Sequence, residues 1–183
     1  LCLMCVTGLF AQSDSVTVLK PEKFITKHSI KIDNKQVNYT ATAGTLIIKN
    51  EKDEAIASIG YVAYTKDGET EAIKRPVTFA YNGGPGSSSL WLHMGILGPR
   101  RVAVNDPSLN GPAPYKLEDN NFAILDVSDI VMIGPVGTGI SRAVGKSKNA
   151  DFWGVDPDIK SLSQFIKSYI TDNERWNSPK YLL

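Results

Sequence analysis

Eight residues at positions 82–89, Asn-Gly-Gly-Pro-Gly-Ser-Ser-Ser, constrain the fold of this chain more than any other stretch. The alternating apolar run before this octad, residues 76–81, predicts a strand, and the apolar run at 90–97 predicts a helix. Its glycines admit backbone angles closed to other residues and leave the main chain open to a ligand. Ser87 or Ser88 is the expected N-cap of the helix. Backbone amides beside a helix N-terminus attract negatively charged oxygen, so we predict an anion-binding turn; a plain connection is the simpler alternative.

The other segments predict an α/β protein. Period-two alternation indicates antiparallel strands within 29–32, 36–48 and 56–64. The continuous apolar run 129–133 is typical of a strand buried on both faces of a parallel sheet, and 180–183 begins another strand. Between them, we expect a helix that starts at Asp156 and buries Ile159 on its apolar face. We therefore predict part of an α/β-hydrolase fold, a mixed sheet in which N-terminal antiparallel strands are followed by parallel strands.

The octad, together with the later sequence blocks, resembles the serine carboxypeptidase family. The family has Asn-Gly-Gly-Pro-Gly-x-Ser-Ser after a hydrophobic strand, then a short helix and a Gly-Pro pair, here Gly98-Pro99. Four further blocks follow in the family's order, and the likeness covers roughly residues 70 to 183. These blocks are residues 120–128, 130–141, 156–170 and 176–183.

The resemblance implies a serine-type carboxypeptidase that hydrolyses C-terminal peptide bonds. By the family's pattern, the Gly84 backbone N–H is one donor of the oxyanion hole. Asn82 and the Gly83 amide would bind the terminal carboxylate of the substrate. The loop that contains Pro135 and Gly137 would form a wall of the substrate cleft.

The same pattern places the triad outside this chain. The family continues with Gly-Glu-Ser-Tyr-x-Gly, whose serine is the nucleophile, and this sequence ends at Leu183, just before that motif. The later aspartate and histidine also lie beyond it. We expect the full-length protein to be an enzyme and the 183-residue chain to be inactive alone and to fold poorly.

Three positions depart from the family's pattern. Ala80 stands where the family often has tryptophan, Ser87 where eukaryotic members have cysteine, and Gly134 where an acidic or amide residue is usual. Two alternatives therefore stay open: a serine carboxypeptidase-like acyltransferase or esterase, and a non-catalytic exported binding protein.

Rival motifs fail on spacing. The glycine pattern that starts at Gly137 has Arg142 where a dinucleotide-binding motif needs its third glycine, and a phosphate loop ending at Ser147 has Ile140 in place of glycine. No Cys/His cluster suggests a metal site. We expect no cofactor and no metal. Ser89 and His93, four residues apart, are interpreted as an incidental pair.

The N-terminus predicts export. Residues 1–12 are an apolar run followed by small residues, which is typical of the remnant of a signal peptide; a buried strand is the alternative. The hydrolase domain would then be residues 13–183, in the periplasm or secreted. A net charge of +1 gives no argument for nucleic acid or a membrane surface. The expected partners are peptide or protein C-termini, with no membrane contact after signal removal.

Overall fold

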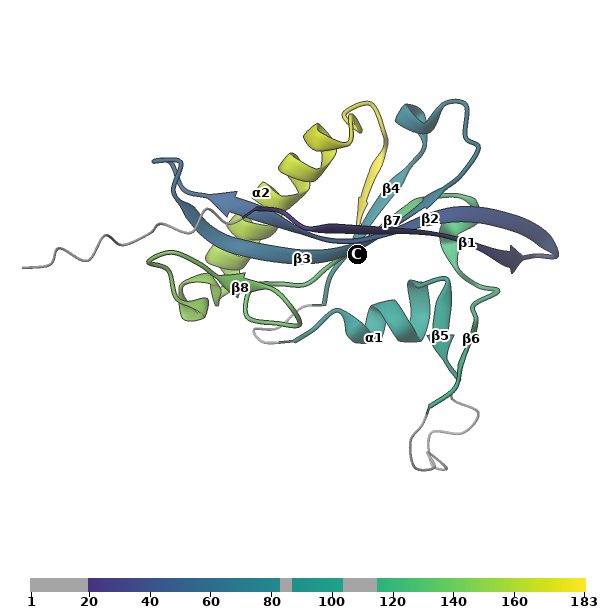
Figure 1. Cartoon of the computed structure of the whole chain (residues 1–183), viewed down its shortest axis with the longest axis horizontal. Helices are drawn as coiled ribbons and strands as arrows, with labels where there is room; N and C mark the ends of the chain where they lie inside the picture. The colour runs from purple at the N-terminus through teal and green to yellow at the C-terminus, as the bar shows by residue number, and fades with distance from the viewer. Residues whose placement is uncertain (1–19, 83–86, 104–114) are drawn as a thin grey trace, which may run out of the picture.

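The computed structural model describes residues 20–82, 87–103 and 115–183. A seven-stranded mixed sheet runs through it, with α2 (Val155–Asp172) on one side and the short helix α1 (Leu90–Leu92) with its π-helical continuation η2 (His93–Leu97) on the other (Figure 1). The strands of this sheet are β1 (Lys23–Ile32), β2 (Lys35–Lys49), β3 (Ala55–Lys66), β4 (Val77–Ala80), β7 (Asp129–Ile133), β8 (Arg142–Ala143) and β9 (Lys180–Leu182). A separate two-stranded ribbon pairs β5 (Arg100–Val102) with β6 (Leu117–Asp119), and short 3-10 turns are η1 (Ala72–Lys74), η4 (Ile124–Asp126) and η5 (Asn149–Phe152).

The sheet changes from antiparallel to parallel at β7. The strand order is β1-β2-β3-β7-β4-β9, and β8 adds to β3. β1, β2, β3 and β7 pair antiparallel, whereas β4 pairs parallel with β7 on one side and with β9 on the other. The predicted mixed sheet, with its N-terminal antiparallel strands, is confirmed.

Strand alternation divides the core between the two faces of the sheet. In β7, Val131 and Ile133 face α2, where Phe165 and Tyr169 pack against Phe79 and Tyr61. Ile130 and Met132 face the opposite side, where Leu97 of η2 and Leu125 of η4 cover them. All five residues of β7 are buried, as expected for a strand covered on both faces.

The helix α2 differs from its prediction at its first turns. It begins at Val155, one residue before the predicted start at Asp156, and its N-cap is Gly154 with a φ of 109°. Gly154 can take this angle because it has no Cβ. Ile159 was expected in the core but is 58% exposed, because the sheet contacts begin only one turn later, at Leu162.

A buried ion-pair network fixes the amino ends of the parallel strands. Asp129, the first residue of β7, accepts from Arg75 Nε at 2.9 Å and from an Arg175 guanidinium nitrogen at 2.7 Å. These three side chains are at most 8% exposed. Asp129 also accepts the Lys66 N–H at the end of β3, and Arg175 donates to the Arg75 carbonyl and to Ser178 Oγ. The network therefore joins β3, β7, and the segments that lead into β4 and β9.

Within the described residues, no helix is long and apolar enough to cross a membrane.

A half-buried histidine–tyrosine pair attaches η2 to the sheet. The Tyr64 hydroxyl lies 2.5 Å from His93 Nε2, and the two rings are 5.5 Å apart. Tyr39 packs edge-on against Tyr64. Burial lowers the pKa of His93 and raises the pKa of Tyr64, so both groups are neutral in the fold near neutral pH.

The His93 shift predicts acid-sensitive stability. The pKa of an unfolded histidine is about 6.5. Since the folded pKa is lower, the unfolded chain binds more protons between the two values, and the free energy of unfolding should fall as the pH falls from about 6.5 toward the lower folded pKa. Urea unfolding between pH 5 and 8 measures this, and His93→Gln should flatten the profile. The matched control is His28→Gln, at the exposed second histidine, which should leave the slope in place; equal profiles for wild type and His93→Gln would contradict the prediction.

Candidate functional site at the carboxyl ends of the parallel strands

The carboxyl ends of β4, β7 and β9 meet at one edge of the sheet. The Tyr81 N–H donates to the Leu183 carbonyl at 3.0 Å, and the Leu183 N–H donates to the Phe79 carbonyl at 2.9 Å. The end of β9 therefore lies beside the residue that leads into the octad. In open α/β sheets, ligands bind outside the carboxyl ends of the strands, so this edge is the candidate site.

Asn82 is the first residue of the octad and lies half-buried at this edge. Its backbone N–H donates to Ser89 Oγ at 3.1 Å, and its side-chain Nδ2 donates to Ser87 Oγ at 2.7 Å. A side-chain amide has two N–H donors and one carbonyl acceptor, so Asn82 can donate further while it keeps the bond to Ser87. The two serines thus hold both the main chain and the side chain of Asn82.

Two of the predicted site residues, Gly83 and Gly84, lie outside the described residues. The oxyanion donor at Gly84 and the carboxylate contact at Gly83 therefore stay predictions. Residues 83–86 all lie outside the described part, and the two residues that flank them, Asn82 and Ser87, are hydrogen-bonded to each other.

The predicted N-cap of the helix after the octad is wrong by one or two residues. Ser89, and not Ser87 or Ser88, precedes the first helical residue, Leu90. The Ser89 hydroxyl makes no capping bond; it donates instead to the Ile133 carbonyl at the end of β7. The carbonyl of Ser89 accepts the His93 N–H, which closes the first helical turn. His93 directs its ring to Tyr64, and the interpretation of Ser89 and His93 as an incidental side-chain pair fits these contacts.

Pro135 and Gly137 lie in a tight loop that follows β7. Pro135 is buried, and its carbonyl accepts a bond from Thr138 Oγ1 at 2.8 Å. Gly137 has a φ of 89°, and a Cβ at this position would lie 3.1 Å from Trp153 Nε1. A side chain here would be strained and crowded, which explains the glycine. The loop closes through the Gly137 N–H, which donates to the Ser141 carbonyl at 3.1 Å.

Two serine hydroxyls at this edge had no assigned role in the sequence. Ser141 is fully buried; its Oγ accepts the Gly60 N–H at 2.8 Å and donates to the Gly134 carbonyl at 2.6 Å. Ser89 makes the same kind of bridge between Asn82 and Ile133. Serines next to glycine-rich turns often bind main-chain groups, and this signal could have singled them out.

The site consists of main-chain and neutral polar groups. Within the part of the chain that the structure describes, no cluster of His, Cys, Asp or Glu could hold a metal ion. Among the described groups, the side-chain amide of Asn82 keeps one N–H donor beyond its bond to Ser87.

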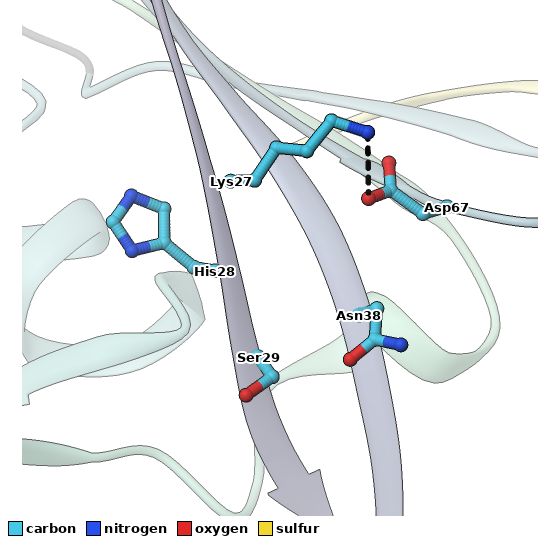
Figure 2. Close-up of a pocket in the computed structure, with 5 residues that line it drawn as sticks. All are labelled: Lys27, His28, Ser29, Asn38 and Asp67. Carbon is cyan, nitrogen blue, oxygen red and sulfur yellow. Dashed lines mark ion pairs between the residues drawn. The ribbon is translucent and has the colours of Figure 1, made fainter.

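A separate hollow of about 450 Å³ lies over the edge strand β1 and its neighbour β2. Lys27, Ser29, Asn38 and Asp67 surround it, and Lys27 and Asp67 form an ion pair at 3.7 Å. Figure 2 shows the His28 ring pointing away from this pair. The hollow is an open polar surface away from the strand ends, and we assign it no part in the candidate site.

Comparison with solved structures places the fold. The chain is similar to Kex1(delta)p, a prohormone-processing carboxypeptidase from Saccharomyces cerevisiae, with a TM-score of 0.60 and 22% sequence identity over 79% of this chain and 30% of that one. The fold is α/β-hydrolase-like. This chain spans less than a third of the length of that carboxypeptidase, 30% by coverage. No family model and no curated protein matches the sequence.

Proposed function

We propose that this chain is the N-terminal part of an exported serine-type carboxypeptidase, with residues 13–183 belonging to its hydrolase domain. The observation that carries the proposal is the position of Asn82. It begins the carboxypeptidase-like octad, and it lies at the carboxyl end of β4, where the ends of β7 and β9 also lie. The likeness in fold to a solved carboxypeptidase supports the same assignment.

Hydrolysis of a C-terminal peptide bond needs two binding features at this edge. The first is a hydrogen-bond donor for the negative oxygen of the tetrahedral intermediate, and we assign the Gly84 N–H to this role. Removal of one such donor typically costs on the order of 3 kcal/mol of transition-state stabilisation. The second is a group that binds the terminal carboxylate. Asn82 suits this purpose because its amide donates hydrogen bonds without a charge of its own, and we assign the Gly83 amide to the same carboxylate.

The nucleophile in this proposal follows Leu183. Because β9 runs parallel to β4 and ends beside Tyr81, a residue just after Leu183 emerges next to the octad. A serine there would lie near Asn82, the first residue of the octad, because Tyr81 bonds Leu183. Its aspartate and histidine partners come from later in the full-length protein.

A second candidate is an esterase or acyltransferase on the same scaffold. Ala80, at the position of the family's frequent tryptophan, is fully buried within the sheet. It offers no aromatic ring to the carboxylate pocket, and this favours a substrate without a free C-terminus.

The decisive assay uses the full-length protein and N-blocked dipeptides. We expect release of the C-terminal amino acid, abolished by an organofluorophosphate, which phosphorylates the active serine and releases fluoride. Hydrolysis of esters without release from free-carboxylate peptides would favour the esterase. Absence of both activities would favour a binding protein. The 183-residue chain serves as the control and should show no turnover; measurable turnover by it would contradict the placement of the nucleophile beyond Leu183.

A further inference from the structure

Two consecutive carbonyls at the end of β7 each accept a bond from a buried serine. The Ile133 carbonyl accepts from Ser89, and the Gly134 carbonyl accepts from Ser141. Ser89 is 6% exposed and Ser141 is 0% exposed. Ser89 comes from the octad, and Ser141 comes from the far end of the 134–141 loop, so the two segments of the candidate site are attached to the same strand end.

Each hydroxyl also accepts a main-chain N–H from a neighbouring strand. Ser89 Oγ accepts from Asn82 after β4, and Ser141 Oγ accepts from Gly60 of β3. Each serine therefore forms a relay. A backbone N–H donates to the serine hydroxyl, and that hydroxyl donates to a backbone carbonyl of the neighbouring segment.

The Ser89 relay lies where the direct pairing of β4 with β7 stops. The last paired residues are Ala80 and Met132. The Tyr81 N–H points toward β9, where it meets Leu183, so alternation along the strand directs the Asn82 N–H toward β7. Because a hydroxyl lies between this N–H and the Ile133 carbonyl, the two segments are farther apart than a direct hydrogen bond would hold them. Ser89 does so in place of capping α1, which is the usual use of a serine just before a helix.

We propose that Ser89 and Ser141 are positioning residues of the candidate site. Ser89 fixes the main chain of Asn82, and Ser141 fixes the loop that carries Pro135 and Gly137. Together, they set the spacing between the carboxylate-binding residue and the facing wall. This inference rests on the proposed carboxypeptidase function for its catalytic consequence, and on the two relays for its structural content.

The test compares Ser89→Ala and Ser141→Ala in the full-length protein. The matched control is Ser128→Ala, because Ser128 is 4% exposed and also bonds a side-chain hydroxyl (Thr78) and a main-chain carbonyl (Asp129), but at the amino end of β7. Each variant is assayed well below its unfolding temperature with two substrates, a blocked dipeptide with a free carboxylate and its C-terminal methyl ester.

We expect Ser89→Ala to lower kcat/KM about tenfold or more for the free carboxylate, chiefly through KM, and to change the ester far less, since small misplacements of binding groups cost up to about a hundredfold. Ser141→Ala should lower kcat/KM for both substrates, because the loop faces the peptide in either form. Ser128→Ala should lower the stability of the protein and leave the ratio of the kcat/KM values for the two substrates unchanged.

Hydrogen exchange gives a readout that does not depend on activity. Ser89→Ala should speed hydrogen exchange at the backbone N–H of Asn82, and Ser141→Ala should speed it at the backbone N–H of Gly60. Ser128→Ala should change neither exchange rate. An unchanged substrate ratio in Ser89→Ala, or unchanged exchange at Asn82, would overturn the inference even if the wild type is active. The wild-type protein could lack peptidase activity while the serine variants still show faster exchange at Asn82 and Gly60. That result would refute the proposed function and leave the two relays in place.

Discussion

Asp129→Ala should lower the free energy of unfolding by about 3–5 kcal/mol, the cost of removing one partner from a buried ion pair. Asp129 is the one carboxylate in contact with both Arg75 and Arg175, and all three side chains are almost completely buried. Its loss would leave the Arg175 guanidinium in the interior without its counter-charge, and Arg75 with only the more distant carboxylate of Glu69 at 3.9 Å. The backbone N–H of Lys66 would also lose its acceptor. In the described part of the chain, every buried side-chain nitrogen and oxygen has a hydrogen-bond partner, so removal of the carboxylate would create buried donors that lack an acceptor.

Urea unfolding followed by circular dichroism measures this loss as a shift of the midpoint. Asp119→Ala is the control, because Asp119 pairs with Arg100 at 3.1 Å on the surface, where both side chains are about half exposed. Such a pair contributes at most about 1 kcal/mol. Asp129→Asn should fall between the two, since the amide oxygen still accepts hydrogen bonds while the charge is lost. Equal midpoints for Asp129→Ala and Asp119→Ala would show that the buried network contributes no more than a surface pair.

Asn82→Asp should lower kcat/KM for a free-carboxylate peptide by about a hundredfold in the full-length protein. The change places a negative charge where the proposed function binds a carboxylate, and two like charges about 4 Å apart repel by roughly 1–4 kcal/mol at the dielectric of water or a protein surface. Asn82→Ala should lose less, about tenfold, because it removes donors without adding repulsion. Asn82→Ala loses the hydrogen bond to Ser87, whereas the carboxylate of Asn82→Asp can accept one from the Ser87 hydroxyl, so a larger loss in Asn82→Asp reflects the added charge and not a missing bond.

Steady-state kinetics with the peptide and its methyl ester separate recognition from chemistry. In Asn82→Asp, kcat/KM for the ester should fall little. The fall in kcat/KM for the peptide should become smaller at acid pH, where the new carboxyl group is protonated. Asn38→Asp makes the same chemical change on the exposed face of β2 and should leave both substrates unaffected. A similar loss for peptide and ester would mean that Asn82 acts on the fold of the site and not on the carboxylate.

The elements of the sheet were predictable because their patterns are local. Alternation in residues 36–48 and 56–64 located β2 and β3, and the unbroken apolar run 129–133 located β7 as a doubly covered strand. The insertion of β7 between β3 and β4 was not visible, since strand order depends on pairings between distant segments. The Asp129 network was missed for the same reason: Arg75 and Arg175 are 100 residues apart in the chain.

The position of Asn82 at a strand end was predictable from the sequence, whereas its contacts with neighbouring segments were not. The octad located Asn82 at a strand end, and the structure brings that strand end beside Leu183. The roles of Ser89 and Ser141 depend on which main-chain groups the turns present, and a sequence pattern does not specify that. Ile159 was misplaced because helical spacing assigns a face to the whole helix, whereas α2 meets the sheet only from Leu162 onward.

The central place of β7 has a consequence for how the chain is made. Lys66 at the end of β3 and Asp129 at the start of β7 are separated by 63 residues. At about 5–20 residues per second, a ribosome needs roughly 3 to 13 seconds to cover that distance. During this interval the β1–β2–β3 meander can already form from neighbouring segments. The edge of β3 that later pairs with β7 and both edges of β4 are still unpaired at this stage. A nascent chain of this kind would depend on chaperones to shield these open edges until translation delivers the strand that joins the two halves.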